Sequence, residues 1–328
     1  MRRRLSPSAW PAWLAVALAT LWALAGCKHE SSKPPPASGS AATTGPQATG
    51  PDPWASKTPA APLIERPLMW AATKDGHTTY LLGTLHLGIN ADTQLPAWVK
   101  QKLDDARVFA MEADVHDPGL LSALKRTDGG SLRLELGPDY WKKLEDVLGA
   151  DLANGFDKLK PFAVMSMLEA HFLPTTLPMD AVLEARAKEK GKPVIYFESA
   201  LRQLEIVEPF MTAPDVKAYL DKLDYAKAQS AEMLDAYQRG DDATLGKQFE
   251  DQTLWIAAGR DPAQFDGFVK ALLANRNETW IPQLEKINDE GGGFVAVGAG
   301  HLVGPGNVLG MLAARGFTVT RVTGDTTP

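Results

Sequence analysis

Two histidines in this sequence follow an apolar run and a glycine at the same spacing. The stretch YLLGTLHLG places His86 three residues after Gly83, and FVAVGAGHLVG places His301 three residues after Gly298. An imidazole near neutral pH binds metal ions and moves protons. A single histidine after a glycine is more often a turn residue, but the matched pair indicates two halves of one active site. Glycine at a strand end allows unusual backbone angles and the close approach of another group.

Two glutamates stand at similar places. Glu112 follows the apolar run 108–111, and Glu198 follows the run 194–197. Ligands of open α/β sheets bind outside the carboxyl ends of the strands, so parallel neighbouring strands would bring both carboxylates to the two histidines. Each glutamate alone also fits a simpler role, as a negative charge at the start of a helix.

These residue types together predict a metal-dependent hydrolase. Two neutral imidazoles and the Glu112 carboxylate can hold a divalent ion and leave positions open for water. The ion would lower the pKa of that water and make it a nucleophile, and a carboxylate would take its proton. Glu112 is thus a candidate ligand or general base, and Glu198 is a further catalytic candidate. Arg276, between two asparagines at a predicted helix break, would stabilise the oxyanion. His116 fits either a fourth site group or a loop, and we favour the loop.

Several classes of protein are disfavoured by motifs that the sequence lacks. It contains no Gly-x-Ser-x-Gly, no His-Glu-x-x-His, no Walker A and no Gly-x-Gly-x-x-Gly stretch, which argues against serine α/β-hydrolases, zincins and nucleotide-binding proteins. A net charge of -6 without a basic stripe argues against nucleic acid as a partner. Cys27 is the only cysteine, so the folded part is predicted to have no disulfide and no thiolate ligand.

The first 27 residues are typical of a secretion signal. Arg2–Arg4 form a basic start, and the apolar stretch Ala12–Ala25 is shorter than the roughly 20 apolar residues of a membrane span. It ends in Leu-Ala-Gly-Cys, which resembles the lipobox of bacterial lipoproteins and implies cleavage before Cys27 and lipidation of its sulfur. Lys28 at the next position suggests the outer membrane. We therefore expect a lipoprotein anchored to the outer membrane and facing the periplasm; the alternative is an ordinary secretory signal with an incidental cysteine.

The remaining chain divides by composition into residues 28–62 and 63–328. The first part is rich in Pro, Ala, Ser, Thr and Gly, which predicts a flexible tether. In the second part, predicted strands alternate with helices. This favours an α/β fold: a mostly parallel or mixed sheet flanked by helices, with two pseudo-symmetric halves that each end in a Gly-x-x-His turn and a large helical insert between them. The predicted strands are 66–72, 77–82, 107–111, 194–197, 294–297 and 317–322, and the predicted helices include 140–148, 162–172, 179–190, 216–239, 265–274, 278–288 and 307–315.

From about Leu68 to Val322 the sequence resembles the TraB/GumN family. The two Gly-x-x-His motifs in this order, with an Arg-Asn pair between them, are the most specific part of the match. The family is related to Tiki-type metalloproteases, erythromycin esterase-like enzymes and ChaN-like haem-binding proteins. The residues that carry the resemblance are Gly83-Thr84-Leu85-His86, Glu112, Met179-Asp180, Gly191-Lys192-Pro193, Glu198, Gln203, Arg276-Asn277, Trp280 and Val297–Gly304.

The resemblance implies an α/β fold of two related halves and a site made of His86, His301, Glu112 and Arg276. Through the Tiki-type members it implies metal-dependent cleavage of peptides or proteins, with Mn or Co favoured and Zn also considered. It leaves the roles of Glu198 and Asp180 open.

Three rival hypotheses stand beside a lipid-anchored metallopeptidase. In the first, His86 acts directly as a base on water, Glu112 orients it, and the substrate is an ester or another acyl compound. In the second, the protein is a binding lipoprotein whose histidines lie near the iron of haem or hold another ligand. In the third, the site of an envelope protein has no catalytic role.

Overall fold

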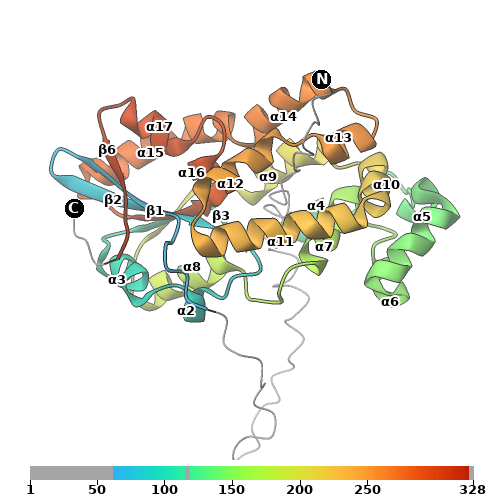
Figure 1. Ribbon diagram of the computed structural model, residues 1–328, viewed down its shortest axis with the longest axis horizontal. Helices are drawn as coiled ribbons and strands as arrows, with labels where there is room; N and C mark the ends of the chain where they lie inside the picture. Colours follow the sequence, from blue (N-terminus) through green and yellow to red (C-terminus); the bar gives the residue numbers. More distant parts are fainter. Residues whose placement is uncertain (1–61, 115–118, 325–328) are drawn as a thin grey trace, which may run out of the picture.

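The computed structural model describes residues 62–114 and 119–324. The predicted signal, Cys27 and almost all of the tether lie outside the described residues, as does His116. Within them, a six-stranded mixed sheet is flanked by helices, which confirms the predicted fold class (Figure 1). The strands are β1 (Met69–Lys74), β2 (His77–Thr84), β3 (Phe109–Asp114), β4 (Val194–Ser199), β5 (Phe294–Gly298) and β6 (Thr318–Arg321).

The order of the strands brings four carboxyl ends to one edge of the sheet. The order is β4-β3-β5-β2-β1-β6. The first four strands in this order are parallel to one another, whereas β1 runs antiparallel to both β2 and β6. Thr84 of β2 pairs with Gly298 of β5, and Ala113 of β3 pairs with Glu198 of β4. Residues that follow these strands, or stand at their last positions, therefore meet at the same edge.

β1 and β2 form a hairpin across Asp75-Gly76, a dipeptide that is typical of two-residue hairpin turns when it stands between apolar runs. Both residues have positive φ, 53° for Asp75 and 81° for Gly76, as a two-residue hairpin turn requires. Lys74 pairs with His77 beside the turn. β2 then continues two residues beyond its predicted end, so that it leads directly into the first Gly-x-x-His stretch.

Helices make up most of the other described residues. They are α2 (Ala91–Gln94), α3 (Ala97–Asp105), α4 (Gly119–Ala123), α5 (Leu132–Leu148), α6 (Ala150–Gly155), α7 (Pro161–His171), α8 (Met179–Glu189), α9 (Ala200–Val207), α10 (Ala213–Asp221), α11 (Leu223–Arg239), α12 (Asp242–Lys247), α13 (Thr253–Ala257), α14 (Phe265–Leu272), α15 (Ala274–Asp289), α16 (Ala299–Val303) and α17 (Val308–Ala313), with 3-10 turns η2 (Glu208–Phe210), η3 (Gln248–Glu250) and η4 (Pro262–Gln264). Figure 1 shows α15 and α17 on one face of the sheet, α3 and α8 on the other, and a helical region with α5, α6 and α10 beyond its carboxyl edge. In the described ranges, no helix has both the length and the apolar character needed to cross a membrane.

The structure divides two helical regions at other positions than predicted. The predicted helix 216–239 is split into α10 and α11 because Lys222 leaves the helical conformation, with φ -118° and ψ 29°. The buried positions keep a helical spacing through this break, so the sequence gives no sign of it. The break predicted around Arg276 lies instead at Leu273, with φ -118° and ψ -74°, so Arg276 and Asn277 occupy the first turn of α15.

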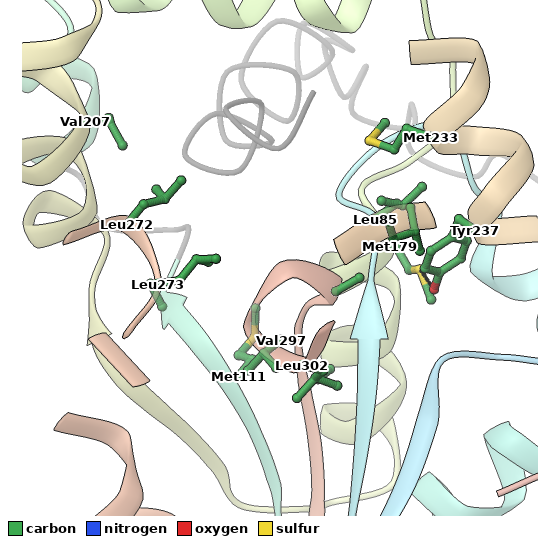
Figure 2. Packing of buried hydrophobic residues seen from close by; sticks show 14 of the residues in the cluster. Leu85, Met111, Met179, Val207, Met233, Tyr237, Leu272, Leu273, Val297 and Leu302 are labelled. Atoms are coloured by element: carbon green, nitrogen blue, oxygen red, sulfur yellow. Dashed lines mark hydrogen bonds between the residues drawn. The ribbon is translucent and has the colours of Figure 1, made fainter. Parts of the chain in front are cut away.

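The hydrophobic core surrounds the central strands. All five residues of β5 are buried, as expected for a parallel strand covered by helices on both faces. Figure 2 shows the core near the carboxyl edge, with Met111, Val297 and Leu302 beside β3, β5 and α16. Tyr237 of α11 reaches the same region and donates a hydrogen bond to the carbonyl of Gly83, at 2.7 Å. The polar residues of the edge thus stand on a rigid, packed base.

Candidate active site

The five predicted site residues converge at the carboxyl edge of the sheet. Glu112 and Glu198 are near the ends of β3 and β4, rather than just after them. His86 is two residues past β2, and His301 is in α16 directly after β5. Arg276 reaches the same place from α15. The parallel topology, and not closeness in sequence, brings them together.

The two motif glycines provide space rather than unusual backbone angles. Neither Gly83 nor Gly298 has a positive φ, so only the second expected reason for a glycine holds. A Cβ on Gly298 would lie 3.0 Å from Oε1 of Glu112 and 3.4 Å from Nε2 of His86. A Cβ on Gly83 would lie 3.0 Å from the Cα of Ala299. Gly298 therefore keeps open the space between two functional side chains, and Gly83 allows β2 to pack against α16.

The Glu112 carboxylate is held at both oxygens. Oε1 accepts a hydrogen bond of 2.6 Å from the backbone N–H of Gly298 and lies 3.5 Å from Nε2 of His301. Oε2 accepts bonds from Arg276, at 2.8 Å, and from Gln203, at 3.1 Å. Burial raises the pKa of Glu112, but His301, Arg276, His86 and the N–H of Gly298 favour the ionised carboxylate more strongly and lower the pKa to about 2. Glu112 is therefore ionised at neutral pH.

Arg276 binds both glutamates at once. Its Nε donates to Oε1 of Glu198 at 2.8 Å, and one terminal nitrogen donates to Glu112 and Glu198 together. The other terminal nitrogen donates to the carbonyl of Leu272 at 3.0 Å. Gln203 also bridges the two carboxylates. Four of the five N–H donors of the guanidinium are engaged. This geometry suits a clamp on two carboxylates better than an oxyanion binder, and the oxyanion role stays a prediction.

Asn277 orients the ring of His301. Its Nδ2 donates to the carbonyl of Gly306 at 2.8 Å, so its Oδ1 faces Nδ1 of His301, 2.6 Å away. This network assigns the ring proton to Nδ1 and leaves a lone pair on Nε2. The ring also packs against Trp280, with 4.4 Å between the centroids. Burial is the largest cause that lowers the pKa of His301 to about 3, so this imidazole is neutral at physiological pH.

Asp180, for which the sequence predicted no definite role, holds the ring of His86. Nδ1 of His86 lies 2.5 Å from Oδ2 of Asp180, at the start of α8. Burial lowers the pKa of His86, but the charge and hydrogen bond of Asp180 outweigh it, so the pKa is raised above 6.5. The contact spans 94 positions in the chain, and only the family resemblance pointed to Asp180.

The side chains fit a divalent ion in part. Within the described residues, Nε2 of His86 and Nε2 of His301 are buried and have no hydrogen-bond partner. The other ring nitrogen of each histidine is held by a second side chain, as is usual for metal-ligating histidines. Glu112 would serve as a third ligand only after a change in its present hydrogen bonds. Across 62–114 and 119–324, no group of three or more His, Cys, Asp or Glu side chains is arranged to hold a metal ion.

The fold and the site define an α/β protein with two histidines and a clamped pair of glutamates at the carboxyl edge of a mixed sheet. The model of the TraB/PrgY/gumN family matches residues 68–321, and the chain belongs to this family. A search of curated proteins and a search of solved structures gave no significant match. The family prediction is confirmed, while the relation to Tiki-type, esterase-like and haem-binding proteins stays a prediction.

Proposed function

We propose that the protein is a metal-dependent hydrolase of the cell envelope that cleaves peptides, with His86 and His301 as ligands of a Mn, Co or Zn ion. The observation that supports this proposal is the pair of buried Nε2 atoms without a hydrogen-bond partner. A buried polar atom left unpaired costs about 1–3 kcal/mol, and an ion between the two rings would satisfy both. When bound, such an ion supplies Lewis acidity and lowers the pKa of water. An anchor at Cys27 would hold the enzyme at the outer membrane.

Four further side chains of the site would each have a separate role. Glu112, ionised and fixed beside His301, is the third candidate ligand or a general base. Glu198 has one carboxylate oxygen bound to Arg276 and Gln203, and its other oxygen would accept a proton. Arg276 holds both carboxylates in place through hydrogen bonds in a buried setting. Trp280 covers the ring of His301 and limits the access of water.

Metal content of the full chain, purified without a metal-binding tag, tests the proposal directly. Elemental analysis before and after loading with Mn, Co or Zn should give a stoichiometric ion in the parent and none in His86→Ala or His301→Ala. His77→Ala and His171→Ala are matched controls, since both side chains are exposed and should leave the ion in place. A parent that binds none of the three ions would contradict the proposal, and haem titration with a search for a Soret band would then test the binding role.

A metal-free hydrolase is the second candidate. It is favoured because no three His, Cys, Asp or Glu side chains among the described residues are arranged so that they could hold a metal ion. Nε2 of His86 would take a proton from water directly, and the substrate would be an ester or another acyl compound. Asp180, rather than Glu112, contacts Nδ1 of this histidine. Hydrolysis that persists in excess chelator would favour this candidate over the metalloenzyme.

A further inference from the structure

The carboxylate of Asp180 joins two residues of the first Gly-x-x-His stretch. Its Oδ1 accepts a hydrogen bond of 2.7 Å from the hydroxyl of Thr84, and its Oδ2 lies 2.5 Å from Nδ1 of His86. Thr84 is fully buried and Asp180 is 5% exposed. The backbone N–H of Met179 also donates to the carbonyl of His86, at 3.1 Å. The start of α8 is thus fastened to the segment after β2 through backbone and side chains together.

This contact determines which nitrogen of His86 carries the ring proton. An ionised carboxylate only accepts hydrogen bonds, so both partners of Asp180 must donate to it. Thr84 donates its hydroxyl proton, and His86 must donate a proton from Nδ1. In the neutral form of the ring, Nε2 then carries no proton and its lone pair is free, whereas in the charged form both nitrogens carry a proton. Without Asp180, nothing among the described contacts of Nδ1 would prevent the proton from moving to Nε2.

Two contacts of Tyr237 help to hold Thr84 and Asp180 in place. Tyr237 of α11 donates to the carbonyl of Gly83 at 2.7 Å, and its hydroxyl lies 3.5 Å from the sulfur of Met179. Tyr237 therefore contacts both the end of β2, which carries Thr84, and the start of α8, which carries Asp180. Asp180 and Thr84 meet inside a packed region, where a carboxylate cannot turn toward water instead.

We propose that Asp180 is a positioning residue of this site, held by Thr84, and that it keeps the proton of His86 on Nδ1 so that Nε2 is available for the metal ion. The effect on metal binding rests on the proposed function. The position of the proton does not, since it follows from the hydrogen bonds of the metal-free protein.

Nitrogen NMR of the full chain with 15N-labelled histidine, freed of metal by chelator, tests the proton position. The chain has six histidines, and the signals lost in His86→Gln assign this ring. At a pH high enough for the His86 ring to be neutral, we expect a proton on Nδ1 in the parent and a shift of the proton toward Nε2 in Asp180→Ala. Asp180→Asn keeps an oxygen that can accept from Nδ1, as Asn277 does for His301, and should retain the parent pattern. A proton on Nε2 in the parent, or an unchanged ring in Asp180→Ala, would overturn the inference.

Thr84 supplies a second variant with a smaller change. Thr84→Val removes the donor to Asp180 while keeping the shape of the side chain, and Thr84→Ser keeps the donor. We expect a partial shift of the His86 proton in the valine variant and none in the serine variant. An equal position of the His86 ring proton in the valine and serine variants would contradict the role of Thr84.

Metal affinity separates this inference from the proposed function. Removal of a residue that orients a ligating histidine typically lowers metal affinity by about 10- to 100-fold, and we expect this range for Asp180→Ala, with less loss in Asp180→Asn. If the parent binds no metal but the NMR pattern is as expected, the proposed function fails and the positioning role stands. If the parent binds metal and Asp180→Ala binds it equally well, the positioning role fails alone.

Discussion

Replacement of Arg276 with methionine should lower the free energy of unfolding by about 4 kcal/mol. The guanidinium is 4% exposed and binds two carboxylates whose side chains are 6% exposed in Glu112 and 9% exposed in Glu198. Methionine fills a similar volume but leaves both carboxylates buried without a cation. Removing one partner of a buried ion pair typically costs about 3–5 kcal/mol, and here two pairs share the removed partner. Such a loss is a large part of the roughly 5–15 kcal/mol that stabilises a typical domain.

The pH dependence of this loss identifies its cause. In the parent, the pKa of Glu112 is lowered from 4.5 to about 2, so its stabilising contribution is complete above pH 4.5 and is lost as the pH falls toward 2. Without the guanidinium, the buried carboxyl takes up a proton at a higher pH in the folded state. The difference between parent and variant should therefore be greatest at pH 7 and shrink at pH 4. Urea unfolding, followed by circular dichroism and tryptophan fluorescence in the presence of chelator, measures it.

Two control proteins show whether buried charge is responsible. In Arg276→Met combined with Glu112→Gln and Glu198→Gln, the unpaired charges are absent, and most of the lost stability should return at pH 7. Arg315 has a side chain that is 43% exposed and lies 3.9 Å from Glu285, so Arg315→Met should cost less than about 1 kcal/mol. A loss below about 1 kcal/mol for Arg276→Met, or an equal loss at pH 4 and pH 7, would refute the clamp.

Three further perturbations probe other contacts. Burial raises the pKa of Glu169 well above 4.5, so the carboxyl ionises at a lower pH in the unfolded chain, and the free energy of unfolding falls as the pH rises above 4.5. Glu169→Gln should remove up to about 1.4 kcal/mol per pH unit of this slope. Urea unfolding that gives the same pH slope for parent and variant would contradict this. Gly298→Ala would place a Cβ 3.0 Å from Oε1 of Glu112 and should lower metal affinity or kcat/KM at least about tenfold, whereas Gly267→Ala, which meets nothing within 4 Å, should leave both unchanged. Asn277→Ala removes the acceptor of Nδ1 in His301 and should lower metal affinity by about 10- to 100-fold, with Asn277→Asp less affected; calorimetric titration with Mn would measure both, and equal affinities would refute the orienting role.

The convergence of the site was predictable because each strand-end residue carries a local signal. His86, Glu112, Glu198 and His301 all follow or end an apolar run, and parallel strands place their carboxyl ends at one edge. The hairpin was equally visible, since Asp-Gly between two apolar runs has few alternatives.

The partners of the two histidines carry no such signal. Asp180 lies in a helix 94 positions from His86, and helical periodicity does not distinguish a carboxylate that faces a site from one that faces solvent. Asn277 was noticed as part of a supposed helix break and of the Arg-Asn pair in the family resemblance, but without a role of its own. Its position in the first turn of α15 is what brings its amide to His301. Arg276 was correctly grouped with the site, but its engagement with two carboxylates depends on side-chain directions that only the folded structure provides.

The place of β5 in the sheet has a consequence for the order in which the chain acquires structure. β3 and β2 are joined only through β5, which comes from residues 294–298, near the end of the chain. Contacts of Glu112 with Arg276 and Gly298 close loops of 164 and 186 residues. Such distant pairings slow folding, since the loops must close before the contacts form. A chain still being synthesised, or one truncated before Phe294, therefore holds two separate strand pairs, and the side chains of the candidate site can meet only after β5 has been made.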